Sequence, residues 1–575
     1  MEPDRMASRL LEFLTALRRR KVYRAGGVYV AVSLAIIGAA DAGLPETLWA
    51  QLQVPVGILL LVGFPVALVL AWAYELRPES WGKPNVEEGV RTEDAPGRTE
   101  ADPPVVGVGP QAGRSVAVLP FENMSPGSEE DYFADGIAEE LTNALARQPG
   151  LRVAARTSAF AFRGVPIDVR EIGARLNVSH IIEGSVRRSA NTVRITAQLI
   201  DCSDGYHIWS EQFDRDLGDV FRIQEEIAAR VVRGLPGEPS VEIKPEIPAT
   251  ELSAYEAFLR GRHALANFGP RSIARAIEEF QACIRIDDSY APAFAGLADA
   301  LTNQSIGFSD HPPMEAMTRA GEAARRALEL DPELPGGHLS LALFRMWHEF
   351  DFPGAKEAFD RALEINPNFS DAYLWMEFYW TYVRHEFHEA LRANRRAFHL
   401  SPLDSRANVR LGTIHMVFGQ YDQAERSYHQ ALSENPDDPV SHLGLGDTLF
   451  RVGRTDEGIS HVEKAVFLGG RPTPWLGMLA SFLGTAGDEK RAREVFRELE
   501  RRAESGYVSG FWMALALAGQ QRFPEAFSRL DRAVEERDSN LIYLFAVPRE
   551  IGLHDRPEFT GILNRIGLGH LARFI

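Results

Sequence analysis

The stretch Leu411-Gly-Thr-Ile-His-Met-Val-Phe-Gly-Gln-Tyr-Asp-Gln-Ala-Glu-Arg-Ser-Tyr-His-Gln-Ala-Leu-Ser-Glu-Asn-Pro436 decides the fold of the C-terminal half of this 575-residue chain. In it Ala424 is followed seven positions later by Ala431, and Pro436 stands five positions beyond that. Residues seven apart return to the same face of an α-helix, and helices approach closely only where such small side chains meet. The proline cannot continue a helix and marks its end. The stretch therefore predicts a closely packed pair of helices.

This pattern recurs from residue 251 to residue 539. Its first small residue falls at Ala276, Ala320, Ala355, Ala390, Ala424, Gly458, Ala492 and Ala526, spaced by 44, 35, 35, 34, 34, 34 and 34 residues. The residue seven positions on is Cys283, Ala327, Ala362, Ala397, Ala431, Ala465, Leu499 and Ala533. A period of 34 is that of tetratricopeptide repeats, which this region resembles, and we expect an all-α solenoid of about eight repeats. The ten additional residues in the first spacing are expected to form a loop around 305–313, because a solenoid tolerates an insertion best at a turn.

The resemblance implies a concave wall lined by the first helix of each pair. In the family's register this wall would receive Trp347, Trp375, Phe378, Tyr382, Arg406, Arg410, Asp447 and Arg451. An aromatic patch beside a basic stripe suits an extended acidic or apolar peptide, so we expect a groove for a protein or peptide partner. Two alternatives stay open: the aromatic residues fill seams between helices, and the arginines are solvated surface. Residues 540–575 lack the repeat pattern and are expected to cap the exposed hydrophobic end of the array.

A smaller α/β unit is expected over residues 115–235. The run 115–120 is short and apolar, as is typical of a strand buried on both faces. Apolar and polar residues alternate over 193–199, and after a turn the run 206–213 completes a hairpin. One face of that hairpin must be covered, and an apolar stripe at helical spacing over 220–232 predicts the covering helix.

Three motifs in this unit resemble the TolB-like domain of bacterial signalling proteins. They are Ser-Val-Ala-Val-Leu-Pro-Phe-Glu-Asn-Met-Ser at 115–125, Asp-Tyr-Phe-Ala-Asp-Gly-Ile at 131–137 and Trp-Ser-Glu-Gln-Phe-Asp-Arg at 209–215. In that family the domain often precedes tetratricopeptide repeats, and sibling chains carry a class III nucleotide cyclase, a winged-helix DNA-binding domain or a protein kinase ahead of it. The resemblance implies a regulatory or assembly module and brings no established active site with it.

Residues 1–77 are expected to form a two-helix membrane anchor, which resembles the short anchor of a subset of these proteins. Residues 54–74 are uncharged and match the roughly 20 residues that span a bilayer. The segment 25–44 is a shorter second span, with an interfacial helix as the alternative. Basic residues precede the first span and are missing from the loop 41–53, which predicts a cytoplasmic amino terminus. Two spans place the soluble part in the cytoplasm at a bacterial inner membrane, whereas a single span places it in the periplasm.

The composition limits the kinds of partner that the chain is expected to bind. Proline-rich stretches at 78–114 and 236–250 are expected to be linkers. The net charge of −18 argues against a nucleic-acid partner, since it repels phosphate backbones. The two cysteines, Cys202 and Cys283, provide neither a disulfide framework nor a thiolate zinc site. Self-association stays open.

The sequence shows no catalytic motif that we can assign. His348-Glu349 and the run 385–389 lack the spacing of a zinc protease, because no two histidines stand four apart with the glutamate between them. We expect no cofactor and no metal. The first hypothesis is a non-enzymatic, membrane-anchored scaffold that binds a protein partner. The alternatives are a small-ligand sensor related to cyclase-associated regulators, and a periplasmic factor that assists envelope assembly.

Overall fold

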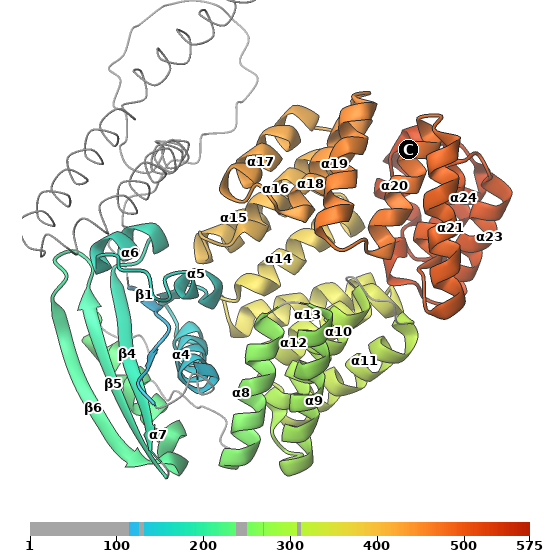
Figure 1. Ribbon diagram of the computed structural model, residues 1–575. Coiled ribbons are helices and arrows are strands. Elements are labelled where there is room, and N and C mark those ends of the chain that lie inside the picture. The colour runs from blue at the N-terminus through green and yellow to red at the C-terminus, as the bar shows by residue number, and fades with distance from the viewer. Residues whose placement is uncertain are drawn as a thin grey trace, which may run out of the picture. The chain divides into compact units, whose positions relative to one another are not determined.

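The computed structural model describes residues 114–125, 131–189, 191–236, 250–267, 269–306 and 312–574 (Figure 1). The expected anchor 1–77 with its spans 25–44 and 54–74, and nearly all of the linkers 78–114 and 236–250, lie outside these residues. Within the part that is described, no helix is both long and apolar enough to cross a bilayer.

A mixed sheet forms the first described unit. Its strands run in the order β3-β1-β4-β5-β6, with β2 paired to β4 beside the end of β1. β1 is parallel to both β3 and β4, and β4, β5 and β6 form an antiparallel meander. The strand bounds are β1 Ser115–Val118, β2 Glu122–Asn123, β3 Arg152–Val153, β4 His180–Ser189, β5 Thr192–Asp201 and β6 His207–Asp216.

Helices cover the two faces of this sheet. α4 and α7 pack on one face and share a core with β5, while α5 and α6 pack on the other face against β1 and β4. The bounds are α4 Asp131–Ala146, α5 Arg156–Phe160, α6 Val169–Leu176, the short turn η2 Leu217–Asp219 and α7 Val220–Gly234. The regular register of β5 and β6 pairs Leu199 with the half-buried Trp209. The shift that follows pairs Ile200 with His207 and leaves Ile208 unpaired and exposed. The covering helix predicted over 220–232 is α7.

Helix pairs follow the sheet unit. The first four are α8 Leu252–Ala266 with α9 Pro270–Ile286, α10 Ala291–Ile306 with α11 Pro313–Leu330, α12 Pro335–Phe344 with α13 Phe352–Ile365, and α14 Ser370–Phe378 with α15 Phe387–Leu400. The next four are α16 Ser405–Val417 with α17 Tyr421–Glu434, α18 Pro439–Arg451 with α19 Thr455–Leu468, α20 Thr473–Thr485 with α21 Glu489–Ser505, and α22 Gly510–Gly519 with α23 Phe523–Glu535.

The small residues that define the period lie where the sequence predicted them. Each alanine of the first set is in the second helix of a pair and at most 1% exposed, and Gly458 is buried in α19. The insertion predicted around 305–313 falls between the end of α10 at Ile306 and the start of α11 at Pro313. The spacing therefore reports helix-to-helix contact, as expected from side chains that must fit between closely approaching backbones.

Two helices carry one residue more than their counterparts. α12 and α14 each end in a π-helical turn, η3 Arg345–Glu349 and η4 Tyr379–Arg384. The left-handed residue that ends the helix, Phe350, follows Pro335 by 15 positions, whereas Gly419 follows Ser405 by 14 in the regular repeat. Each of these π turns accommodates the one residue by which a 35-residue spacing exceeds the regular spacing of 34. Such π turns are rare and often lie at functional sites.

The chain ends in a C-terminal segment, defined here as residues 537–574. It contains η5 Ser539–Ala546 and η6 Arg549–Ile551, then α24 Pro557–Arg565 and η7 Gly569–Phe574. α24 packs against α23, as a cap would. The same segment also contacts η3 and η4 of the earlier repeats, which the sequence did not predict.

Candidate functional site

The aromatic residues expected in the groove gather at or beside the π-helical turns. Trp347 on η3 lies 4.8 Å from Phe378 and 6.1 Å from Trp375, measured between ring centroids. Phe378 in turn lies 4.5 Å from Tyr382 on η4. Each π turn shifts the end of its helix relative to a regular repeat, and the two shifted ends meet in one aromatic surface. We call Trp347, Phe378 and Tyr382 the aromatic seat.

The aromatic seat is occupied by the protein's own Tyr543. The Tyr543 ring lies 5.8 Å from Trp347, 5.6 Å from Phe378 and 5.1 Å from Tyr382, edge-on to the last two. Trp347, Phe378 and Tyr382 are 0%, 3% and 8% exposed, so they do not form an open surface. Burial raises the pKa of the Tyr543 hydroxyl to about 12. The sequence predicted that these aromatic residues line a groove open to a partner. The structure shows them covered instead, because the apolar run 541–547 folds back onto them.

Polar contacts hold the C-terminal segment in this place. Arg451 donates to the Ala546 carbonyl, and Arg537 donates to the carbonyls of His348 and Glu349 at 3.0 and 3.2 Å. Further along, His570 Nε2 lies 2.8 Å from the Val383 carbonyl. The contacts of Arg537 and His570 join the C-terminal segment to repeats nearly 190 residues earlier in the chain.

The expected basic stripe is neutralised by acids of the same chain. Arg410 lies 3.3 Å from Glu377 and stands over the ring of Trp375 at 5.1 Å. Arg451 is paired with Asp447 at 2.8 Å, with both side chains nearly buried. Burial raises the pKa of Glu377, although the Arg410 charge opposes the rise. The arginines that were expected to attract an acidic peptide are therefore occupied at these two positions.

Arg406 stands apart from the aromatic seat in a more open, charged region. It pairs with Asp371 at 2.9 Å and with its own helix-capping Asp404 at 2.7 Å. Asp299 on α10 faces the same charges, and burial raises its pKa to about 6, against the attraction of Arg262. We call Asp299, Asp371 and Arg406 the polar floor. Asp371 and Arg406 keep about half of their side chains exposed, at 49% and 53%.

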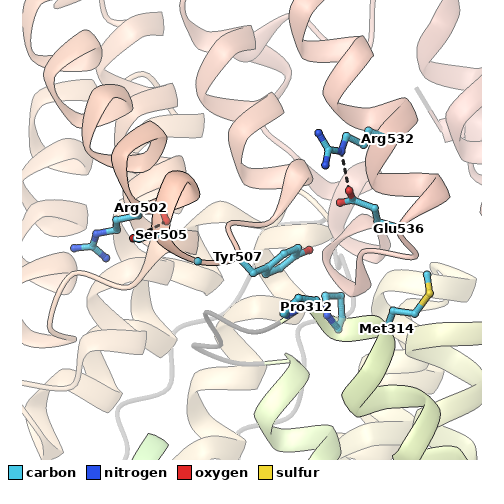
Figure 2. Close-up of a pocket in the computed structure, with 9 residues that line it drawn as sticks. Pro312, Met314, Arg502, Ser505, Tyr507, Arg532 and Glu536 are labelled. Atoms are coloured by element: carbon cyan, nitrogen blue, oxygen red, sulfur yellow. Dashed lines mark hydrogen bonds and ion pairs between the residues drawn. The ribbon is translucent and has the colours of Figure 1, made fainter.

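A separate hollow of about 1030 Å³ lies between the start of α11 and the ends of α21 and α23 (Figure 2). Arg532 bonds Glu536 at 2.7 Å, and Arg502 bonds Glu498 at 2.7 Å. Its charged groups are thus paired within the chain, and we assign no ligand to it. The lining consists of Pro312, Pro313, Met314, Arg502, Ser505, Gly506, Tyr507, Arg532 and Glu536.

No catalytic arrangement emerges from the described residues. Nowhere in them do three metal-ligating side chains converge. His348 and His385 lie under the C-terminal segment, where burial lowers the pKa of both imidazoles. In the sheet unit, Asp131 accepts a hydrogen bond from Asn123 at 2.8 Å and Asp135 pairs with Arg163. Both acids are therefore paired with side chains of the same unit.

The comparisons with known proteins concern parts of the chain. Residues 418–467 match the tetratricopeptide repeat family. Helices α17 and α18 and nearly all of α19 lie within this match. A putative adenylate cyclase 3 of Rhizobium meliloti (strain 1021) is 37% identical over 238 residues, 40% of each chain. The transcriptional regulator HilA of Salmonella typhimurium is 24% identical over 254 residues, 43% of this chain and 44% of its own. The chain thus spans less than half the length of these relatives.

Solved structures of other proteins are also similar to parts of the chain. A tetratricopeptide repeat protein from Parabacteroides merdae is 18% identical, with a TM-score of 0.34, and covers 46% of this chain and 97% of its own. Yeast Tom70 is 18% identical with a TM-score of 0.37, covering 56% of this chain and 68% of its own.

Sequence reasoning missed the occupant of the aromatic seat. The register of the repeats located Trp347, Trp375, Phe378 and Tyr382, because each depends on a local period. Tyr543 lies outside the period, and nothing in its neighbours identifies the surface it contacts. The available signal was the uncharged run Leu541-Ile-Tyr-Leu-Phe-Ala-Val-Pro548, which is more apolar than a solvent-facing cap requires.

Proposed function

We propose that the protein is a membrane-anchored scaffold, without catalytic activity of its own, that binds a protein partner through its repeat array. The observation that carries the proposal is the stack of tetratricopeptide repeats, whose first helices carry both the polar floor and the aromatic seat. Stacked helix pairs of this kind create extended binding surfaces. The sheet unit serves as the regulatory or assembly module.

The polar floor is the part of this surface on which a partner can be tested directly. Its exposed Asp371 and Arg406 offer charge to an incoming chain without displacement of any segment. A photo-reactive amino acid at position 371, irradiated in living cells, is expected to yield covalent adducts larger than the protein. The matched control is the same residue at position 493 on α21, where Arg493 is 57% exposed away from the polar floor. Equal adducts at both positions, or none at 371, would contradict partner binding here.

The anchor and its orientation are a second part of the proposal. The motivation is the uncharged segment 54–74 and the basic residues before 25–44. We propose that residues 1–77 hold the protein at a bacterial inner membrane with its soluble units in the cytoplasm. Protease should cleave the 78–114 tether only after the cells are broken. Cleavage in cells whose outer membrane alone has been permeabilised would place the soluble units in the periplasm instead.

A ligand-sensing role is the second candidate, favoured by the shared core of the sheet unit and the first repeats. Tyr255 and Phe258 of α8 belong to the same buried cluster as Val116 of β1. A ligand on the sheet unit would therefore act on the array through packed side chains. A ligand that binds only the folded protein raises its melting temperature. Screening the intact protein against nucleotides and amino acids should reveal such a shift; a uniformly flat screen counts against the sensor.

A further inference from the structure

Two buried ring nitrogens beneath the C-terminal segment, Trp347 Nε1 and His348 Nδ1, have no hydrogen-bond partner in the described part of the chain. Trp347 is 0% exposed, and its indole N–H can only donate. Buried polar atoms are normally satisfied, and each exception calls for a physical explanation. The surface around the aromatic seat thus offers hydrogen-bonding capacity that its present occupant leaves unused.

The occupant itself contacts the aromatic seat as a short peptide would. Within Asp538–Val547, the Tyr543 ring fills the space between the three seat residues. The backbone of η5 is a 3₁₀ helix, a form with poorer hydrogen-bond geometry than an α-helix. Arg451, from the array, donates to its last carbonyl at Ala546. Leu541, Ile542 and Leu544 are also fully buried in the core around the seat, so the contact combines the aromatic anchor with three apolar side chains and a few hydrogen bonds.

We propose that the aromatic seat is a peptide-binding surface and that Asp538–Val547 is its resting occupant, which a partner segment displaces. The inference deepens the proposed scaffold function and rests on it. The partner is a short apolar segment whose aromatic side chain replaces Tyr543. Beside that anchor it carries an amide, carboxylate or carbonyl oxygen that accepts from Trp347 Nε1. Such a segment makes the hydrogen bond that the chain's own residues do not make.

The direct test uses the internal segment as the probe. A fluorescein-labelled peptide with the sequence Asp538–Val547 is titrated with the full chain, and binding is followed by fluorescence anisotropy. Wild-type protein, whose seat is occupied, should bind it at least tenfold more weakly than the Tyr543→Ala variant. The control variant is Phe467→Ala, which removes a ring that is 79% exposed on α19, and it should behave as wild type. Equal binding to wild type and Tyr543→Ala overturns the proposal.

A measurement on the wild-type chain covers the case in which Tyr543→Ala fails to fold. In native-state hydrogen exchange the amides of 539–547 should exchange through a local opening, at least tenfold faster than the amides of α13 and α15. If the amides of 539–547 exchange only when those helices do, through global unfolding, the segment is a permanent cap. That result would overturn the proposed displacement.

The acceptor is tested by substituted probes. In peptides with Phe545→Asn or Ala546→Asn, at two positions that are only partly buried, one change should tighten binding to the Tyr543→Ala protein relative to the parent peptide. The gain should vanish when the protein also carries Trp347→Phe, which keeps an aromatic ring and removes the donor. If neither peptide binds more tightly, the assigned acceptor is wrong.

The two proposals fail separately. If adducts form at position 371 but the peptide does not bind to the Tyr543→Ala protein, only the displacement inference is contradicted. Peptide binding without adducts at 371 would instead remove the polar floor from the proposed function.

Discussion

At the residue scale, Gln521 occupies a backbone position that suits glycine. Its φ is +62°, and the corresponding residue is Gly419, Gly453 or Gly487 in the three preceding repeats. A residue with a Cβ is strained in this left-handed region, and the Gln521 side chain is exposed and contributes no core packing. We expect Gln521→Gly to raise the free energy of unfolding by about 0.5–1 kcal/mol in urea titrations. Gln520→Gly, at a residue with a negative φ, is the control and should destabilise.

Asp299 in the polar floor gives a pH-dependent prediction. Its folded pKa of about 6 lies above the unfolded value of 3.8, mainly because of burial. The folded state therefore binds this proton more tightly, and ionisation above pH 6 costs stability that is recovered as the pH falls towards 4. Asp299→Asn cannot ionise and can still accept from Asn303. At pH 7.5 it should raise the free energy of unfolding by about 1–2 kcal/mol.

The pH series supplies the control for Asp299→Asn. Urea titrations of both proteins at pH 7.5, 6, 5 and 4 should show the gain shrinking below pH 6 and nearly vanishing at pH 4. A difference between the two proteins that stays constant across the series would mean that the gain comes from the amide's contacts rather than from the lost charge.

At the element scale, the two π turns shape the aromatic seat. One residue corresponds to about 100° of rotation in an α-helix, so removing the extra residue should turn Trp347 away from Phe378 and Tyr543. We expect deletion of Arg345 to cost about 3 kcal/mol or more of folding stability, comparable to loss of a large buried side chain. Urea titration followed by tryptophan fluorescence would measure it. The control is Arg345→Ala, which removes the same side chain and its hydrogen bond to the Gly354 carbonyl but does not shorten the helix. Similar losses in both variants would contradict the rotation argument.

The elements show which features a sequence can predict. The helix pairs and their order followed from a period of 34, because small residues are required wherever two helices approach. The 35-residue spacings were visible too, yet the sequence could not tell a π turn from a longer loop. The seat residues were located by the same period. Their occupant was not, since Tyr543 meets Trp347 across 196 positions and no local pattern encodes such a contact.

At the scale of the whole molecule, the sheet unit and the array share one interior. α4 packs on α8, and Glu139 of α4 pairs with both Arg156 and Arg262. Burial opposes ionisation of Glu139, but the two arginines outweigh it and lower its pKa. The proline-rich linker 236–250 suggested that the sheet unit and the array are separate. The composition of a linker cannot reveal contacts that the two units make elsewhere. The buried cluster that includes Val116 and Phe280 crosses this boundary.

Asn368 joins the two units at a second place, far from the linker in the sequence. Its side-chain amide donates to the carbonyls of Ala146 and Leu151, both at 2.9 Å, from the turn between α13 and α14. Nearby, the Ala155 N–H donates to the Leu400 carbonyl at 2.8 Å. With two such contacts and a common core, the described units should unfold together in one calorimetric transition.

Asn368→Ala should loosen that connection. Removing both donors leaves two carbonyls unpaired at the junction, which should cost about 1–3 kcal/mol. The loss falls on the contact between units rather than inside either, so the calorimetric transition should broaden or split, with the sheet unit melting first. Asp437→Ala alters the equivalent turn two repeats later, where Asp437 is 74% exposed, and should leave the transition unchanged. A single sharp transition in Asn368→Ala, shifted no more than that of Asp437→Ala, would mean that the shared core alone couples the units.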